Sequence, residues 1–109
     1  MTVAEWLTAR APEAPGVLME RLHALLAADL HASAERGADV FLAAAGASLA
    51  RVLDERRVGR DGALDLLAVD ALMTFAFEHA AERGTGVEGL EALTRRGVAA
   101  IAPLAAAHG

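Results

Sequence analysis

Asp70 is the residue whose type and position most directly indicate chemistry. In a helix of about 3.6 residues per turn, it falls among Leu66, Met73 and Phe77, within an apolar stripe. Burying a carboxylate without a partner is costly, so the pattern predicts that Asp70 is paired, hydrogen-bonded or protonated.

The expected partners of Asp70 are Arg51 and Thr74. Arg51 follows the uncharged part of the preceding predicted helix, and Thr74 lies one turn beyond Asp70. In a structural interpretation, the contact fixes the register between helices. In a functional interpretation, Asp70 is an acid, a base or a metal ligand in a pocket, and both remain open at this point.

An apolar pocket around Asp70 would bind an apolar or weakly basic small molecule. Its walls would be the large side chains of the same predicted helix, Met73, Phe75 and Phe77. The candidate ligand-binding residues are Asp70, Met73, Thr74, Phe77 and Arg51.

Motifs for metal or phosphoryl chemistry are weak. Glu20 and His23 have the Glu-x-x-His spacing of di-iron helical bundles, but adjacent Glu78 and His79 diverge by about 100° and supply no second pair. The residues after His23 and His31 do not resemble a phosphotransfer site. We find no Gly-rich phosphate loop, Ser–His–Asp set or zinc motif, so we expect no metal and no cofactor. Enzymatic activity is disfavoured but stays open, with Asp70 as the acid–base group.

Composition narrows the function classes further. The chain has 109 residues and a net charge of −5, which indicates one domain over residues 1–109 and disfavours nucleic-acid binding. It contains no cysteine, lysine or tyrosine, which excludes disulfides, thiol nucleophiles and catalytic lysines. The longest uncharged runs, 40–50 and 97–107, are shorter than the roughly 18–20 apolar residues that cross a bilayer. With no basic segment before an apolar stretch, we expect a cytoplasmic protein without membrane contact.

The elements that position these residues are helical, because alanine and leucine dominate the apolar residues. Capping-box spacing at Thr2–Glu5 and at Thr85–Glu88 predicts two helix starts, and Asp61 is a predicted N-cap. Glu35–Gly37 predicts a helix end, and Pro103 is expected to bend or end the last helix. The predicted helices span residues 2–10, 15 or 16 to 32, 39 or the residues just before it to about 57, 62–83, and 85 to beyond 97. These predict an all-α fold, a compact antiparallel helical bundle of four longer helices plus a short N-terminal helix.

The two central predicted helices are apolar around their whole circumference. Residues 40–50 carry no charge, and residues 64–77 place large apolar side chains at almost every angle. A bundle of this size has too few other helices to cover both central helices. Apolar surface should therefore remain for a partner. The prediction is therefore an accessory or adaptor subunit that acts through protein–protein contact, as a homodimer or with another protein.

Overall fold

The chain forms an all-α bundle. The computed structural model describes residues 1–10, 14–55, 59–84 and 86–108. The helices are α1 (Val3–Arg10), α2 (Gly16–Leu25), the 3-10 helix η1 (Ala34–Arg36), α3 (Gly37–Glu55), α4 (Gly59–Glu82) and α5 (Gly86–His108). The predicted fold class is confirmed. No helix in the described part of the chain is long and apolar enough to cross a membrane.

The centre of the bundle is the antiparallel hairpin of α3 and α4. The buried face of α4 consists of Gly62, Asp65, Ala68, Leu72, Ala76, His79 and Ala80. Glycine and alanine make up most of this face. Such side chains allow two helix backbones to approach closely, and α3 contributes the larger Phe41 and Val52 to the same core. The large side chains of α4 therefore lie mostly on its flanks.

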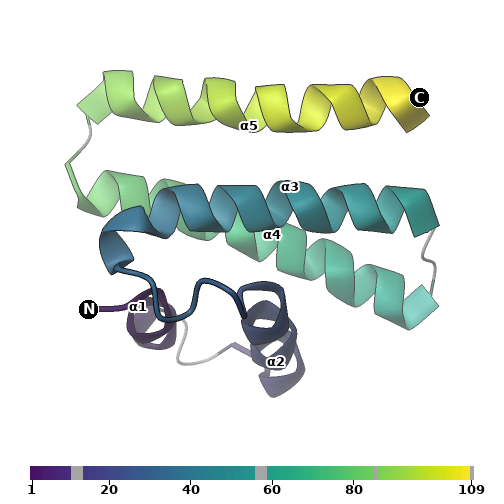
Figure 1. Cartoon of the computed structure of the whole chain (residues 1–109), viewed down its shortest axis with the longest axis horizontal. Coiled ribbons are helices and arrows are strands. Elements are labelled where there is room, and N and C mark those ends of the chain that lie inside the picture. Colours follow the sequence, from purple (N-terminus) through teal and green to yellow (C-terminus); the bar gives the residue numbers. More distant parts are fainter. Residues whose placement is uncertain (11–13, 56–58, 85, 109) are drawn as a thin grey trace.

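The other helices lie in layers on either side of this hairpin. Figure 1 shows α1 and α2 on one side and α5 on the other, running along the hairpin. On the α1 side the cover is thick: Val3, Trp6 and Leu7 of α1 and Leu22 of α2 are all buried. On the α5 side it is thin, because only Leu93 and Gly97 are buried among residues 86–104.

The predicted capping box at the start of α1 is confirmed. The backbone N–H of Glu5 donates to the Thr2 hydroxyl at 3.2 Å, and the backbone N–H of Thr2 donates to the Glu5 carboxylate at 3.0 Å. Two further N–H groups of this first turn, from Val3 and Ala4, donate to backbone carbonyls of Ala32 and Leu30.

That backbone pairing explains why α2 is shorter than predicted. The helix ends at Leu25 rather than near Ala32, and residues 26–31 form turns. The carbonyls of Leu30 and Ala32 accept from the first turn of α1, so this segment lies beside α1 and not in a continuation of α2.

Three other boundaries also differ from the predictions. Glu35–Gly37 leads into α3 through η1 instead of ending a helix, and α4 begins at Gly59, so that Asp61 lies within its first turn. Gly59 has φ +78°, which glycine adopts without strain. α5 continues past Pro103 to His108. The predicted cap at Thr85 and the predicted end of the third helix at Arg57 lie outside the described residues.

Candidate functional site

Asp70 is exposed, so the prediction of a buried carboxylate at this position was wrong. It lies on the outer side of α4, opposite the stripe formed by Ala68, Leu72 and Ala76. Arg51 is also exposed, on α3, and among the residues that the structure describes no ion pair joins it to Asp70. The Thr74 hydroxyl donates to the backbone carbonyl of Asp70 at 3.0 Å and not to its carboxylate.

The buried carboxylate of α4 is Asp65, which has no exposed surface. The guanidinium of Arg21 reaches it from α2 and forms both a hydrogen bond and an ion pair with it. Arg21 keeps 25% of its side-chain surface exposed. Its charge is therefore partly hydrated, while one guanidinium nitrogen binds a buried carboxylate oxygen of Asp65. This contact has the structural role that the sequence pattern assigned to Asp70.

His79 is the second buried polar residue of α4, with 3% of its surface exposed. Its Nδ1 accepts from the backbone N–H of Ala38 at 3.2 Å, and its Nε2 donates to the backbone carbonyl of Ala34. This arrangement requires a neutral ring that carries its proton on Nε2. Because both ring nitrogens are engaged by the backbone, His79 holds the start of α3 in place and offers no free lone pair for catalysis or a metal.

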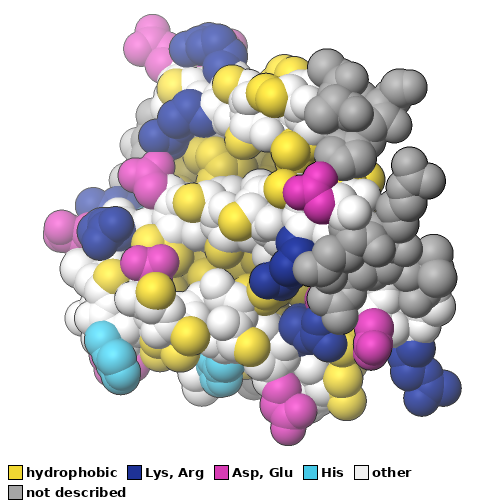
Figure 2. Space-filling view, turned by 45° about the vertical axis from the view of Figure 1, so that its right-hand side comes forward, with side chains coloured by type: hydrophobic (Ala, Val, Ile, Leu, Met, Phe, Trp, Pro, Cys, Tyr) yellow, Lys and Arg dark blue, Asp and Glu magenta, His cyan; other side chains and the backbone are white. Residues whose placement is uncertain are grey.

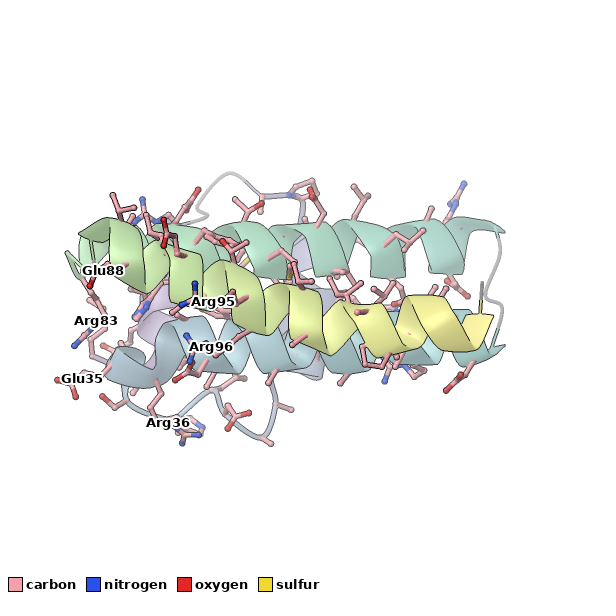
Figure 3. All side chains as sticks on the ribbon, turned by 90° about the horizontal axis from the view of Figure 1, so that it is seen from above. Glu35, Arg36, Arg83, Glu88, Arg95 and Arg96 are labelled. Carbon is pink, nitrogen blue, oxygen red and sulfur yellow. The ribbon has the colours of Figure 1, made fainter. Side chains whose placement is uncertain are left out.

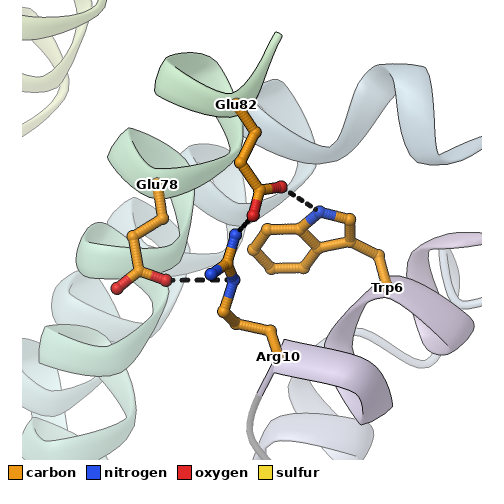
Figure 4. Close-up of polar contacts among 4 residues, drawn as sticks. All are labelled: Trp6, Arg10, Glu78 and Glu82. Atoms are coloured by element: carbon orange, nitrogen blue, oxygen red, sulfur yellow. Dashed lines mark hydrogen bonds and ion pairs between the residues drawn. The ribbon is translucent and has the colours of Figure 1, made fainter.

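A polar cluster joins α1 to the end of α4 (Figure 4). The Arg10 guanidinium pairs with Glu78, at 3.3 Å from Nε, and with Glu82. Glu82 also accepts from the indole N–H of Trp6 at 3.0 Å, and Arg10 lies 5.2 Å from the centroid of the Trp6 ring. These interactions occupy both carboxylates, so the cluster acts as a clamp between the two helices.

A cavity of about 400 Å³ adjoins this clamp. It is lined by Met1, Trp6, Ser33, Ala34, Glu35, His79, Glu82 and Arg83. The lining includes both signs of charge. Of the three groups that could act as a base, His79 and Glu82 are held by the contacts described above, and Glu35 is exposed to solvent. Within the residues that the structure describes, no group of three or more His, Asp or Glu could hold a metal ion.

An apolar groove runs between α4 and α5. Its volume is about 370 Å³, and it is lined by Met73 and Phe77 of α4 and by Thr94, Gly97, Val98, Ile101 and Ala102 of α5. Gly97 contributes because it has no side chain: a Cβ atom there would lie 3.7 Å from the terminal carbon of Met73. Thr94 is the one polar side chain in this lining, and its hydroxyl donates to the backbone carbonyl of Leu90.

The structure brings together part of the predicted ligand-binding set. Met73 and Phe77 line the same groove, whereas Asp70, Thr74 and Arg51 are not in its lining. Phe75 faces the other side of α4, where its ring centroid lies 6.0 Å from that of Trp6 and also 6.0 Å from that of Phe41. The α5 half of the groove was missed, because the sequence pattern gave no sign that α5 crosses Met73 and Phe77.

Exposed aliphatic side chains flank this groove. Val98 is 61% exposed and Leu66 is 50% exposed, and Val87 on α5 is also exposed. We call the surface formed by these side chains and the groove the α4–α5 face. A different side of the molecule is visible in Figure 2, where hydrophobic side chains also remain visible in the seam below α5. α5 therefore leaves part of the apolar surface of the hairpin uncovered.

Charged side chains gather at one end of the bundle. Figure 3 shows Glu35, Arg36, Arg83, Glu88, Arg95 and Arg96 at this end. Arg96 points toward α3 and pairs with Asp39 at 2.8 Å, while Arg95 is exposed and lies over α5 itself in this view. Acidic and basic residues alternate here, so the end of the bundle does not form a strongly basic surface of the kind that binds nucleic acids.

Comparison of the chain with protein-family models, with curated proteins and with solved structures gives no significant match.

Proposed function

We propose that this protein acts through protein–protein contact and that the α4–α5 face is the contact surface. In this proposal the chain is a cytoplasmic homodimer that serves as an accessory or adaptor subunit. The observation that carries it is the exposure of Val98 and Leu66 beside an apolar groove. Large apolar patches of this kind are typical of protein interfaces.

The dimensions of the face support this proposal. α4 has 24 residues and α5 has 23, so each is about 35 Å long at 1.5 Å per residue. Two helices side by side present roughly 700 Å² in projection. A standard interface buries about 800 Å² on each partner, so a contact that covered most of this face would approach that size.

Val98→Glu tests the proposal. A glutamate at the centre of the face would be buried without a partner in the dimer but hydrated in the monomer. We expect the dissociation constant to rise by about tenfold or more, measured by sedimentation velocity over a range of concentrations. Val17→Glu on α2 is the matched control, because Val17 is also 61% exposed and lies away from the face.

Two results would contradict the proposal. One is a wild-type chain that remains an 11.3 kDa particle at high concentration. The other is a dimer that Val98→Glu and Val17→Glu affect equally, since association would then use another surface.

A second candidate function is the binding of an apolar small molecule in the same groove. Its volume of about 370 Å³ falls within the range of about 300–1,000 Å³ that small-molecule sites occupy. This function predicts that an apolar fluorescent dye binds the monomer with a defined stoichiometry and that Gly97→Leu, which fills the groove, abolishes binding. Equal binding of the dye to the wild type and to Gly97→Leu would contradict this second function.

A further inference from the structure

Two opposite charges border the α4–α5 face. Asp70 is exposed on α4, one turn before Met73, and Arg95 is exposed on α5. Arg95 lines a second depression, with Val87, Leu90, Glu91 and Thr94, and Thr94 also lines the apolar groove. The two depressions therefore adjoin at Thr94, with Arg95 in the lining of the second and Asp70 outside both, one turn from Met73 on α4.

The register between α4 and α5 places these charges on opposite sides of the middle of the groove. Gly97 faces Met73, which defines one level along the two antiparallel helices. Asp70 is three residues from Met73, about 4.5 Å along the axis, and Arg95 is two residues from Gly97, about 3 Å in the opposite direction. The two charges are thus separated by about 7–8 Å along the groove, with Met73 and Gly97 between them.

We propose that the second copy of the chain packs on the α4–α5 face about a two-fold axis near Met73 and Gly97, so that Asp70 of each copy pairs with Arg95 of the other. This inference rests on the proposed function, because it specifies the partner and its orientation at the same surface. A two-fold axis forms each contact twice, so one acid and one base on each copy supply two ion pairs. A register that placed Asp70 against Asp70 would oppose like charges.

The remaining charge of the face is compatible with this orientation. Glu91 lies six residues from Gly97, about 9 Å from the axis, at the edge of the interface. Water and salt screen a charge at the rim, whereas Asp70 and Arg95 adjoin the apolar centre, where desolvation strengthens an ion pair. The inner two charges therefore decide the orientation of the two copies.

Charge reversal at the two positions tests this inference directly. Asp70→Arg alone places two arginines together at each contact, and Arg95→Asp alone places two aspartates together. We expect each variant to associate about tenfold more weakly than the wild type. An equimolar mixture of the two variants should associate again, because in the mixed dimer both contacts join an arginine to an aspartate.

The measurements are sedimentation velocity of each variant and of the mixture, with circular dichroism as a check that both variants are folded. Glu20→Arg on α2 is the control for the change in net charge, and Asp70→Asn, which keeps the size of the side chain, should give an intermediate dissociation constant. The pairing is supported if the mixture associates more tightly than either reversal variant alone and if Glu20→Arg by itself associates as the wild type does.

The other outcomes separate this inference from the proposed function. If single reversals do not weaken a dimer that Val98→Glu disrupts, or if the mixture does not associate, the Asp70–Arg95 pairing is wrong and the contact function stands. If the wild-type chain does not dimerise at all, the homodimer itself is wrong.

Discussion

Gly37 lies against the ring of His79, with no room for a larger side chain. A Cβ atom at this position would lie 2.6 Å from Cδ2 and 2.8 Å from Nε2 of the imidazole. The ring cannot move aside freely, because Ala38 and Ala34 bind its two nitrogens. The absence of a side chain at Gly37 is therefore a packing requirement at the start of α3.

Gly37→Ala should destabilise the protein by about 1–3 kcal/mol, because the added methyl group displaces a buried, hydrogen-bonded ring. Thermal or urea unfolding measures the loss. Gly16→Ala is the control, since nothing lies within 4 Å of a Cβ atom there. Equal stability of the two variants would mean that the ring can shift without cost.

Glu5 provides a residue-scale prediction that depends on pH. The backbone N–H of Thr2, and then its hydroxyl, bind the Glu5 carboxylate and hold its pKa below its ordinary value. A lowered folded-state pKa means that this contribution to stability is present above the ordinary pKa. The contribution is lost as the pH falls through the lowered value.

Thr2→Ala should raise the pKa of Glu5 toward its ordinary value, because the hydroxyl is lost while the backbone N–H remains. An NMR titration of the Glu5 carboxyl carbon measures the shift. Thr8→Ala, in the same helix, should leave this pKa unchanged, since the Thr8 hydroxyl binds the carbonyl of Ala4. An unchanged pKa in Thr2→Ala would show that the hydroxyl contributes nothing.

At the scale of elements, the seam between α2 and α4 depends on the contact of Arg21 with Asp65. Arg21→Met keeps the length of the side chain but removes the charge that faces a buried carboxylate. We expect a loss of about 1–3 kcal/mol in the free energy of unfolding. Chemical denaturation measures it, and the loss should be smaller in an Asp65→Asn background.

Arg51→Met is the control for this prediction. Arg51 is exposed on α3, so its replacement should change stability by no more than about 0.5 kcal/mol. If Arg21→Met were as mild as Arg51→Met, the buried carboxylate would not need Arg21.

The helices could be predicted from the sequence, but not which face of α4 is buried. Glycine, proline and the capping box at Thr2 punctuate the chain locally, and these signals located the elements. Asp70 was predicted to be buried because its large neighbours Met73 and Phe77 are apolar. These two side chains lie on the flank of α4 and not on its buried face. The buried stripe instead consists mainly of small residues, such as Ala68 and Ala76, because α3 approaches closely there.

That small-residue stripe is the signal that would have located Asp65 and His79. Asp65 is three residues before Ala68, and His79 is three residues after Ala76, so both continue the stripe. Their partners could not be predicted in this way: Arg21 and the backbone at Ala38 are distant in the sequence and meet these side chains only in the tertiary structure.

At the scale of the whole molecule, the two faces of the central hairpin are covered unequally. The predicted excess of apolar surface is present, although it lies on the flank of α4 and on α5 and not around the full circumference of either central helix. Leu66 and Val98 remain half or more exposed because α5 buries little besides Leu93 and Gly97. This asymmetry is why the proposals concern the α5 side of the molecule.

The imidazole of His79 also bears on the order in which the chain acquires its structure. The N–H groups of a first helical turn have no acceptor within the helix, and a nearby serine, threonine or aspartate usually supplies one. For Ala38 the acceptor comes from 41 residues further along the chain. In a nascent chain released only as far as α3 this acceptor is missing, so the N–H of Ala38 bonds to water until α4 has been synthesised and has docked.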